Sequence, residues 1–544
     1  MSASSKKKLR SAEQAMQLTE RQRTEQKEAK KLKIFSIVMV AVMVLMVVFA
    51  VSIVASKVIT KANLGKNQRE TVAVTVGEHE ISAAEFNCYF VDAVSSFYSN
   101  YGSYASLFGL DVTKPLDQQV YDEEAGTTWA DEFTATAKED VKAIYGIVDA
   151  AAANGFSLSD DDKAYIDSQM SNIAASAIMY GFSNTEEYLQ AMYGTGVNEE
   201  IVRKYIEARH TAQRYENSVA DSLEFTDADL QAKDNENPNV FSTFSYNYYY
   251  LNTSKFLEGG VEDAEGNKTY SDAEQAAALA AAEAAAKSLV EGTNNVEQLN
   301  IAIAALPINA EATSATSTTC TDYSYDYVSD AMKEWVTDSS RQAGDMTYLP
   351  SVSTADDGTE TISGYYVVYF TERNNNEMLL QNVRHILAKF EGGTTDESGV
   401  TTYSDEEKAA AKEAADAIYA EWKAGEATEE SFAALANEKS DDGDGTTGGL
   451  YEDIYPGQMV PAFNDWCFDA SRQAGDTDVV ETEYGYHIMY YVGASEQTYR
   501  AMQIENTLIN EAVQAWYDEI VSAVTLTEGS LEYVPTGMIL SSGN

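Results

Sequence analysis

Two of the four histidines of this chain lie in apolar, β-type runs, one near each end of a single segment. His385 lies in Val-Arg-His-Ile-Leu and His487 lies in Gly-Tyr-His-Ile-Met. Terminal strands of a small domain can be neighbours in one sheet, so we expect the two imidazoles to face each other and fix each other's tautomer. One such histidine is more often a core residue, but a pair in this arrangement indicates a site.

An acidic, Gly-rich loop separates the two histidines and contains Asp442. Its aspartate spacing is partly that of a calcium loop, but the bidentate Glu that closes such a loop is missing. Met459 and Phe463 follow, four residues apart. We expect them on one helical face, either lining a pocket or packing in the core.

No metal site is expected, because the three cysteines and four histidines show no metal-ligand spacing. The cysteines are far apart and odd in number, so no disulfide framework is implied.

Four motifs in this segment, in order and at normal spacing, resemble the parvulin family of prolyl isomerases. They are the opening R-H-I-L-A-K, the S-D-D-G loop leading to G-G-L, the stretch G-Q-M-V-P-A-F, and the closing Y-G-Y-H-I-M. The resemblance covers residues 381–493. There are two departures: Gly449 stands where an Asp often precedes the Leu, and Val460 replaces a Gln common beside the Met.

The resemblance implies a site for each of these motifs. A hydrogen-bonded catalytic pair would be His385 and His487, and the family's Cys-or-Asp position falls on Asp442. The apolar proline pocket would be Leu450, Met459 and Phe463, and Tyr484, at a variable position, is assigned to substrate contact.

The implied chemistry needs neither a nucleophile nor a cofactor. Rotation about an X-Pro amide crosses a barrier of about 18–20 kcal/mol and takes tens of seconds or more uncatalysed. An apolar pocket that grips the proline ring, beside polar groups that favour the twisted amide, is sufficient to accelerate it.

The segment before this module has a related sequence. Residues 270–278 match residues 403–411, both opening an Ala-rich helix with an S-x-x-E capping box, and residues 334–345 match residues 465–476. We interpret this as one fold, duplicated. The first copy has Tyr366 at the position of the closing histidine and no histidine in its opening strand, so by resemblance it is a degenerate parvulin-like domain. Its many tyrosines are either peptide-contact or packing residues.

The region from 71 to 237 has a strand at Thr71–Val76, a capping box at Ser82–Glu85 and then a helical pattern. It is similar to the N-terminal chaperone domain of SurA- and PrsA-type foldases. The tail after residue 496 is again amphipathic and helical, and we expect it to pack back onto this helical domain.

The N-terminus predicts a membrane anchor. Residues 1–33 carry ten Lys and Arg against four Glu, and residues 34–56 contain no charge, which is long enough to span a bilayer as one helix. A cleaved signal peptide is the alternative. The basic tail should stay in the cytoplasm, which places the rest outside the cell membrane. The net charge of −50 argues against a nucleic-acid partner.

The sequence thus predicts an α+β chain with a transmembrane helix, a helical chaperone-like domain, two parvulin-like domains and a C-terminal helix. The boundaries are 1–33, 34–56, a linker at 57–70, 71–237, 238–375, 376–495 and 496–544. The expected function is peptidyl-prolyl isomerase and chaperone for exported, X-Pro-containing polypeptides. The alternative is a non-catalytic holdase with vestigial isomerase domains. The oligomeric state is not predicted.

Overall fold

The structure, a computed structural model, describes residues 61–540 except positions 265, 313, 356, 357, 397 and 444. The expected cytoplasmic tail and membrane span, residues 1–33 and 34–56, lie outside these residues. Within the described part, no helix is both long and apolar enough to cross a membrane. Two compact units are present: one ends at Glu224 and resumes at Thr507, and the other is Phe225–Asn506.

The first unit contains a small antiparallel sheet of order β17-β1-β2, formed by Leu526–Glu528, Val72–Val76 and His79–Ser82. The predicted strand at Thr71–Val76 is confirmed as β1. The edge strand β17 was not predicted. It pairs with β1 from the far end of the chain, with Val74 opposite Glu528.

Long helices form most of the first unit. They are α3 (Lys61–Glu70), α4 (Ala83–Tyr101), α5 (Trp129–Ala153), α6 (Asp160–Met179), α7 (Thr185–Tyr193) and α8 (Glu199–Asp221). Residues 102–128 are not α-helical, although a helical pattern was expected there. They form the 3₁₀ turns η1 (Gly102–Phe108) and η2 (Leu116–Gln118) and a hairpin of β3 (Val120–Asp122) and β4 (Thr127–Thr128).

The predicted capping box at the start of α4 is only half correct. Ser82 caps the helix by accepting from the Glu85 backbone N–H at 3.2 Å. The Glu85 side chain does not return to Ser82. It is buried and accepts hydrogen bonds from the Tyr145 hydroxyl and, at 2.8 Å, from Lys204 Nζ. A buried carboxylate is stabilised more by a cation and a hydroxyl than by one backbone amide, so tertiary contacts override the local motif.

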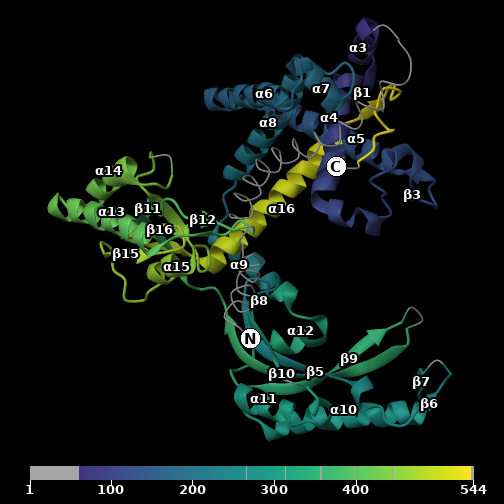
Figure 1. Cartoon of the computed structure of the whole chain (residues 1–544), viewed down its shortest axis with the longest axis vertical. Coiled ribbons are helices and arrows are strands. Elements are labelled where there is room, and N and C mark those ends of the chain that lie inside the picture. The colour runs from purple at the N-terminus through teal and green to yellow at the C-terminus, as the bar shows by residue number, and fades with distance from the viewer. Residues whose placement is uncertain are drawn as a thin grey trace. The chain divides into compact units, whose positions relative to one another are not determined.

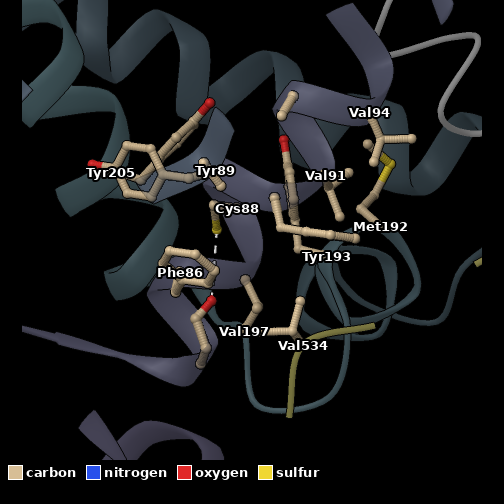
Figure 2. Close-up of a cluster of buried hydrophobic side chains, with 14 of the residues drawn as sticks. Phe86, Cys88, Tyr89, Val91, Val94, Met192, Tyr193, Val197, Tyr205 and Val534 are labelled. Carbon is tan, nitrogen blue, oxygen red and sulfur yellow. Dashed lines mark hydrogen bonds between the residues drawn. The ribbon is translucent and has the colours of Figure 1, made fainter. Parts of the chain in front are cut away.

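The core of the first unit combines side chains from distant parts of the sequence (Figure 2). Phe86 and Tyr89 of α4 belong to one core cluster with Met192 of α7, Tyr205 of α8 and Val534 of the C-terminal segment. The Tyr89 and Tyr205 rings meet edge-on at 4.9 Å.

The C-terminal helix α16 (Tyr499–Ala523) also contributes apolar side chains to this unit. Trp516, Tyr517 and Ile520 pack against Ile147 and Tyr215, so the expected return of the tail onto the helical domain is confirmed.

The second unit begins with α9 (Asp227–Glu236), a helix expected to belong to the preceding domain. α9 buries none of its own residues, so no apolar face holds it to other helices. Its Asp234 instead forms an ion pair with Arg500, whose guanidinium also donates to the Pro238 and Phe241 carbonyls.

The rest of the second unit contains two sheets of equivalent strand order, β8-β5-β10-β9 and β14-β11-β16-β15. In the first copy the elements are β5 (Thr243–Asn252), α10 (Asp272–Gly292), α11 (Val296–Ala304), β8 (Thr318–Ser324), α12 (Asp330–Val336), β9 (Met346–Thr354) and β10 (Glu360–Asn374). In the second they are β11 (Leu379–Lys389), α13 (Asp405–Ala424), α14 (Glu429–Lys439), β14 (Leu450–Ile454), α15 (Pro461–Cys467), β15 (Thr477–Glu481) and β16 (Gly485–Thr498).

The two copies also share local devices. Both predicted capping boxes are present, at Ser271 and at Ser404. In each box the Glu also accepts from a glycine N–H in the preceding hairpin, Glu274 from Gly260 and Glu407 from Gly393. The sequence repeat therefore corresponds to a structural repeat.

Each sheet is covered on both faces (Figure 1). Helices α10 and α11 cover one face of the first sheet and α12 the other. In the second sheet, Ile386 and Ile488 pack against α13 and α14, while Val383 and Met489 pack against α15 on the opposite face. The two histidines lie on this α15 face, because side chains alternate along a strand.

Candidate active site

His385 and His487 lie on the adjacent central strands β11 and β16. In the antiparallel ladder His385 is opposite Met489 and His487 is opposite Leu387, so the histidines are diagonal neighbours on one face. Their Nδ1 atoms are 3.1 Å apart, and both side chains are buried. The predicted facing pair is confirmed in its geometry.

Asp442 contacts the other ring nitrogen of His385. Its Oδ2 lies 3.0 Å from His385 Nε2 and accepts a second hydrogen bond, at 2.9 Å, from the Tyr451 hydroxyl. The hydrogen bond from His385 is the main cause that lowers the pKa of Asp442 to about 2. Asp442 is therefore an ionised acceptor at neutral pH, and His385 must carry a proton on Nε2.

The other ring is kept neutral. Burial, with a smaller contribution from His385, lowers the pKa of His487 to about 4. Its Nε2 lies 2.9 Å from Thr482 Oγ1. With Nε2 of His385 donating to Asp442, Nδ1 of a neutral His385 accepts from Nδ1–H of His487. Nε2 of His487 then accepts from the Thr482 hydroxyl. Four side chains thus form one oriented chain of hydrogen bonds.

The loop that holds Asp442 is fixed to β11 by backbone contacts. Ser440 Oγ accepts from the Leu387 and Asp442 amides, and the Asp441 amide donates to the Leu387 carbonyl at 2.9 Å. Gly449 closes the loop with φ +66°, and a Cβ there would lie 2.2 Å from the His385 carbonyl oxygen. The Gly-Gly pair is thus required for the loop to approach the histidine strand.

Apolar side chains line the inner side of the histidine pair. The Phe463 ring is edge-on to both imidazoles, with centroids 5.3 Å from His385 and 5.4 Å from His487. Met459 packs in the same cluster. The two are not on one helical face as expected, because α15 begins at Pro461 and Met459 precedes it. Met459 instead packs, from the residues before the helix, against the cluster that contains Phe463.

Leu450 and Tyr484 are placed differently. Leu450 is half-buried and lies opposite Arg384 in the β11–β14 ladder. Arg384 binds Glu429 of α14, on the sheet face away from the histidines, so the ladder places Leu450 toward that face too. Tyr484 is 58% exposed, and its backbone N–H donates to Thr482 Oγ1 at 3.2 Å. Substrate contact by either side chain remains a prediction.

Sequence reasoning missed Thr482 and Tyr451. Thr482 orients His487, and Tyr451 binds Asp442 with its ring 5.0 Å from that of His385. Neither stands in a motif that marks a catalytic role. The only sequence signal is position: Thr482 directly follows β15 and Tyr451 is the second residue of β14, and each of these strands flanks a histidine strand.

The first copy has tyrosines at the positions of both histidines. Tyr248 lies opposite Val368, as His385 lies opposite Met489, and Tyr366 occupies the place of His487. The two rings meet edge-on at 5.9 Å, and Tyr250 lies against Tyr366 at 4.7 Å. Phenol rings have no imidazole nitrogen, so this copy cannot form the hydrogen-bonded chain of the second.

The described residues contain no group of three or more His, Cys, Asp and Glu that could hold a metal ion. Asp444, part of the calcium alternative, lies outside them. Cys467 is near the histidines in the apolar cluster, but burial raises the pKa of its thiol to about 12. It therefore stays protonated and is a packing residue rather than a nucleophile.

A comparison with known families identifies the domain that contains these residues. Residues 385–493 match the rotamase family, described as the PPIC-type PPIase domain. The match begins on His385 and includes Asp442, Thr482 and His487. The second copy is therefore a peptidyl-prolyl cis-trans isomerase domain of the parvulin type, and the enzyme class is peptidyl-prolyl isomerase.

Similar solved structures include three proteins named PrsA. That of Bacillus anthracis is 20% identical, with 27% of this chain and 59% of that chain covered and a TM-score of 0.16. That of Bacillus subtilis is 13% identical, with 84% and 91% covered and a TM-score of 0.24. That of Bacillus cereus is 14% identical, with 60% and 86% covered and a TM-score of 0.17. A search of curated proteins found no match.

Proposed function

We propose that the chain is a membrane-anchored foldase that isomerises X-Pro bonds in exported polypeptides outside the cell membrane. The observation that carries the proposal is the hydrogen-bonded chain Asp442–His385–His487–Thr482 beside the Phe463 ring. Phe463 and Met459 would hold the proline ring. The polar chain would stabilise the twisted amide, whose charge distribution differs from that of the planar one.

Catalysis is assigned to the second copy alone. The test is protease-coupled isomerisation of an Ala-X-Pro-Phe p-nitroanilide peptide by the full chain. We expect His385→Ala and His487→Ala each to lower kcat/KM at least about 10-fold, since each breaks a buried hydrogen-bonded network. The matched control is Tyr248→Ala with Tyr366→Ala in the first copy, which should leave the rate unchanged. Equal activity in both sets of variants would refute the assignment.

A chaperone activity is the second part of the proposal. The first copy favours it, because it keeps the fold and has a cluster of tyrosine rings where the second copy has its histidines. If the isomerase variants still suppress aggregation of a denatured client as well as the native chain does, binding and isomerisation are separate activities. If suppression disappears together with isomerisation, the two are one activity and the holdase component is excluded.

The proposed location rests on the N-terminal sequence. Residues 34–56 contain no charge and follow a basic segment, which is typical of an uncleaved anchor with its N-terminus in the cytoplasm. The expected result is that the chain remains in membranes after alkaline carbonate extraction and that protease added outside intact cells digests it. Release by carbonate would contradict the anchor.

A further inference from the structure

Six large apolar side chains on the first unit are exposed to solvent, and we call them the aromatic patch. They lie at the end of α4, in η1 and in β3, and their exposed fractions run from 46% for Tyr101 to 80% for Leu107. The members are Tyr101, Tyr104, Leu107, Phe108, Val120 and Tyr121. Soluble domains seldom expose contiguous apolar groups of this size unless the surface binds something.

Ring contacts connect three members of the patch, Tyr101, Phe108 and Tyr121, to the core. Tyr101 and Phe108 meet at 5.3 Å, and both lie against the half-buried Phe97. Phe97 contacts Trp129 at 5.0 Å, and Tyr121 meets the same indole edge-on at 4.9 Å. Trp129 is only 2% exposed, so the outer rings rest on buried aromatic side chains. Such rings offer contact area at low conformational cost.

The backbone beneath the patch is held in place by one buried side chain. Gln119 is 7% exposed; its Oε1 accepts from the Asp111 N–H at 2.7 Å, and its Nε2 donates to the Lys114 and Pro115 carbonyls. In the hairpin, Asp122 Oδ1 accepts from the Glu124 and Ala125 amides. The surface is therefore formed before any partner arrives, which reduces the entropy cost of binding.

The charges around the patch define the partner. Residues 97–128 contain one lysine, Lys114, which is already paired with Asp111 at 2.9 Å. The same segment contains four further carboxylates: Asp117, Asp122, Glu123 and Glu124. An apolar surface bordered by unneutralised carboxylates attracts apolar groups that carry positive charge beside them and repels anionic ones.

Two other occupants fit this charge pattern poorly. A second copy related by a twofold axis would bring the same carboxylates against each other. An anionic lipid surface would meet the same repulsion. An unfolded segment with basic residues next to its apolar side chains satisfies both the apolar and the electrostatic requirement.

We infer that the aromatic patch binds unfolded polypeptide segments whose aromatic and aliphatic residues are flanked by Lys or Arg. This inference rests on the proposed foldase function and adds the surface and the class of client. It places client capture on the first unit, on residues that take no part in isomerisation.

The test is fluorescence anisotropy with the full chain in detergent and two labelled peptides. Both peptides contain the core Phe-Leu-Tyr-Phe, one flanked by three Lys at each end and the other by three Glu. The patch variant is Tyr104→Ser with Leu107→Ser and Tyr121→Ser. The matched control is Ile178→Ser with Met179→Ser and Tyr180→Ser, which removes another exposed apolar triplet of the same unit, 79%, 68% and 39% exposed.

We expect the native chain to bind the Lys-flanked peptide at least about 10-fold more tightly than the Glu-flanked one. The patch variant should lose at least about 10-fold in affinity for it, because interface aromatics carry a large share of binding energy. The control should change less than about 2-fold. Gln119→Leu, which frees the loop but keeps the patch residues, should weaken binding by an intermediate factor.

Several results would overturn the inference. Unchanged peptide affinity in the patch variant, or equal affinity for the two peptides, excludes it. Sedimentation velocity that shows a native dimer separated into monomers by the patch variant would assign the surface to a second copy. Flotation with anionic vesicles, lost only in the patch variant, would assign it to lipid. Isomerisation of the p-nitroanilide peptide is measured on the same samples and tests the foldase proposal separately. If the native chain does not catalyse this isomerisation, the foldase proposal is refuted whatever the anisotropy shows.

Discussion

The charge on Asp442 is the feature of the site that can be tested most sharply. In the structure its carboxylate accepts from His385 Nε2 at 3.0 Å and from the Tyr451 hydroxyl at 2.9 Å. Asp442→Ala removes the acceptor, so nothing then determines which His385 nitrogen carries the proton. The Nδ1–Nδ1 contact with His487 would lose its fixed donor and acceptor.

The size of the effect follows from the contact. A hydrogen bond to a charged group contributes about 1.5–3 kcal/mol, and the Asp442 side chain is 38% exposed, which places it toward the low end because of solvent screening. A loss of about 1–2 kcal/mol lowers kcat/KM by about 5- to 30-fold. Asp442→Asn should lose less, since its amide oxygen still accepts from Nε2–H.

The assay is protease-coupled isomerisation at neutral pH, with near-ultraviolet circular dichroism to verify the fold. The neighbouring Asp441 is the matched control. Its carboxylate accepts from the Lys389 N–H at 3.0 Å rather than from a histidine, so Asp441→Asn should stay within about 2-fold of the native rate. A folded Asp442→Ala variant with native kcat/KM would refute the reasoning. An equal loss in Asp441→Asn would show that only the overall charge of the loop matters.

Three further predictions concern the same site. Thr482→Val removes the donor to His487 Nε2 and should lower kcat/KM about 2- to 10-fold in the coupled assay. Thr482→Ser keeps a hydroxyl and should restore the rate. A valine variant as active as the native protein would exclude the oriented series of hydrogen bonds. Phe463→Ala should destabilise the isomerase domain by about 3–5 kcal/mol, because the ring is 3% exposed, and should raise KM; urea unfolding without a shift would contradict this. Folding lowers the pKa of His487 from 6.5 to about 4. Between these two pH values the unfolded chain binds a proton that the folded chain does not, so the free energy of unfolding should fall as the pH decreases from about 6.5 toward 4. Above about pH 6.5, kcat/KM should be level. A His487→Gln chain with the same loss of stability in that pH interval would assign the effect elsewhere.

The isomerase site shows how far motifs alone define chemistry. Each motif is short and lies on one strand or loop, so sequence could name His385, Asp442 and His487 and expect the two rings to face each other. It could not supply the partner of His487. Thr482 acts because a turn brings its hydroxyl to within 2.9 Å of Nε2, and no local pattern distinguishes it from any other turn threonine.

The N-termini of α13 and α4 show the same difference between what a local pattern predicts and what tertiary contacts decide. At Ser404 the capping box forms as the S-x-x-E pattern predicts, because both partners lie in one exposed turn. At Ser82 the same pattern fails, because α5 and α8 bring Tyr145 and Lys204 to the buried Glu85 carboxylate. A local rule holds where solvent is the only competitor and gives way where a distant side chain offers a stronger bond.

By itself, the sequence determined the duplication, the capped Ala-rich helix of each copy and the motifs of the isomerase domain, since these depend on periodicity and residue type within short segments. Tertiary structure decided that Leu450 lies opposite Arg384, that Met459 packs from outside α15 against the cluster containing Phe463, and that β17 completes the N-terminal sheet. It also decided which apolar side chains stay exposed as the aromatic patch. These features depend on strand register and on contacts between residues far apart in the chain, and neither is encoded in a local pattern.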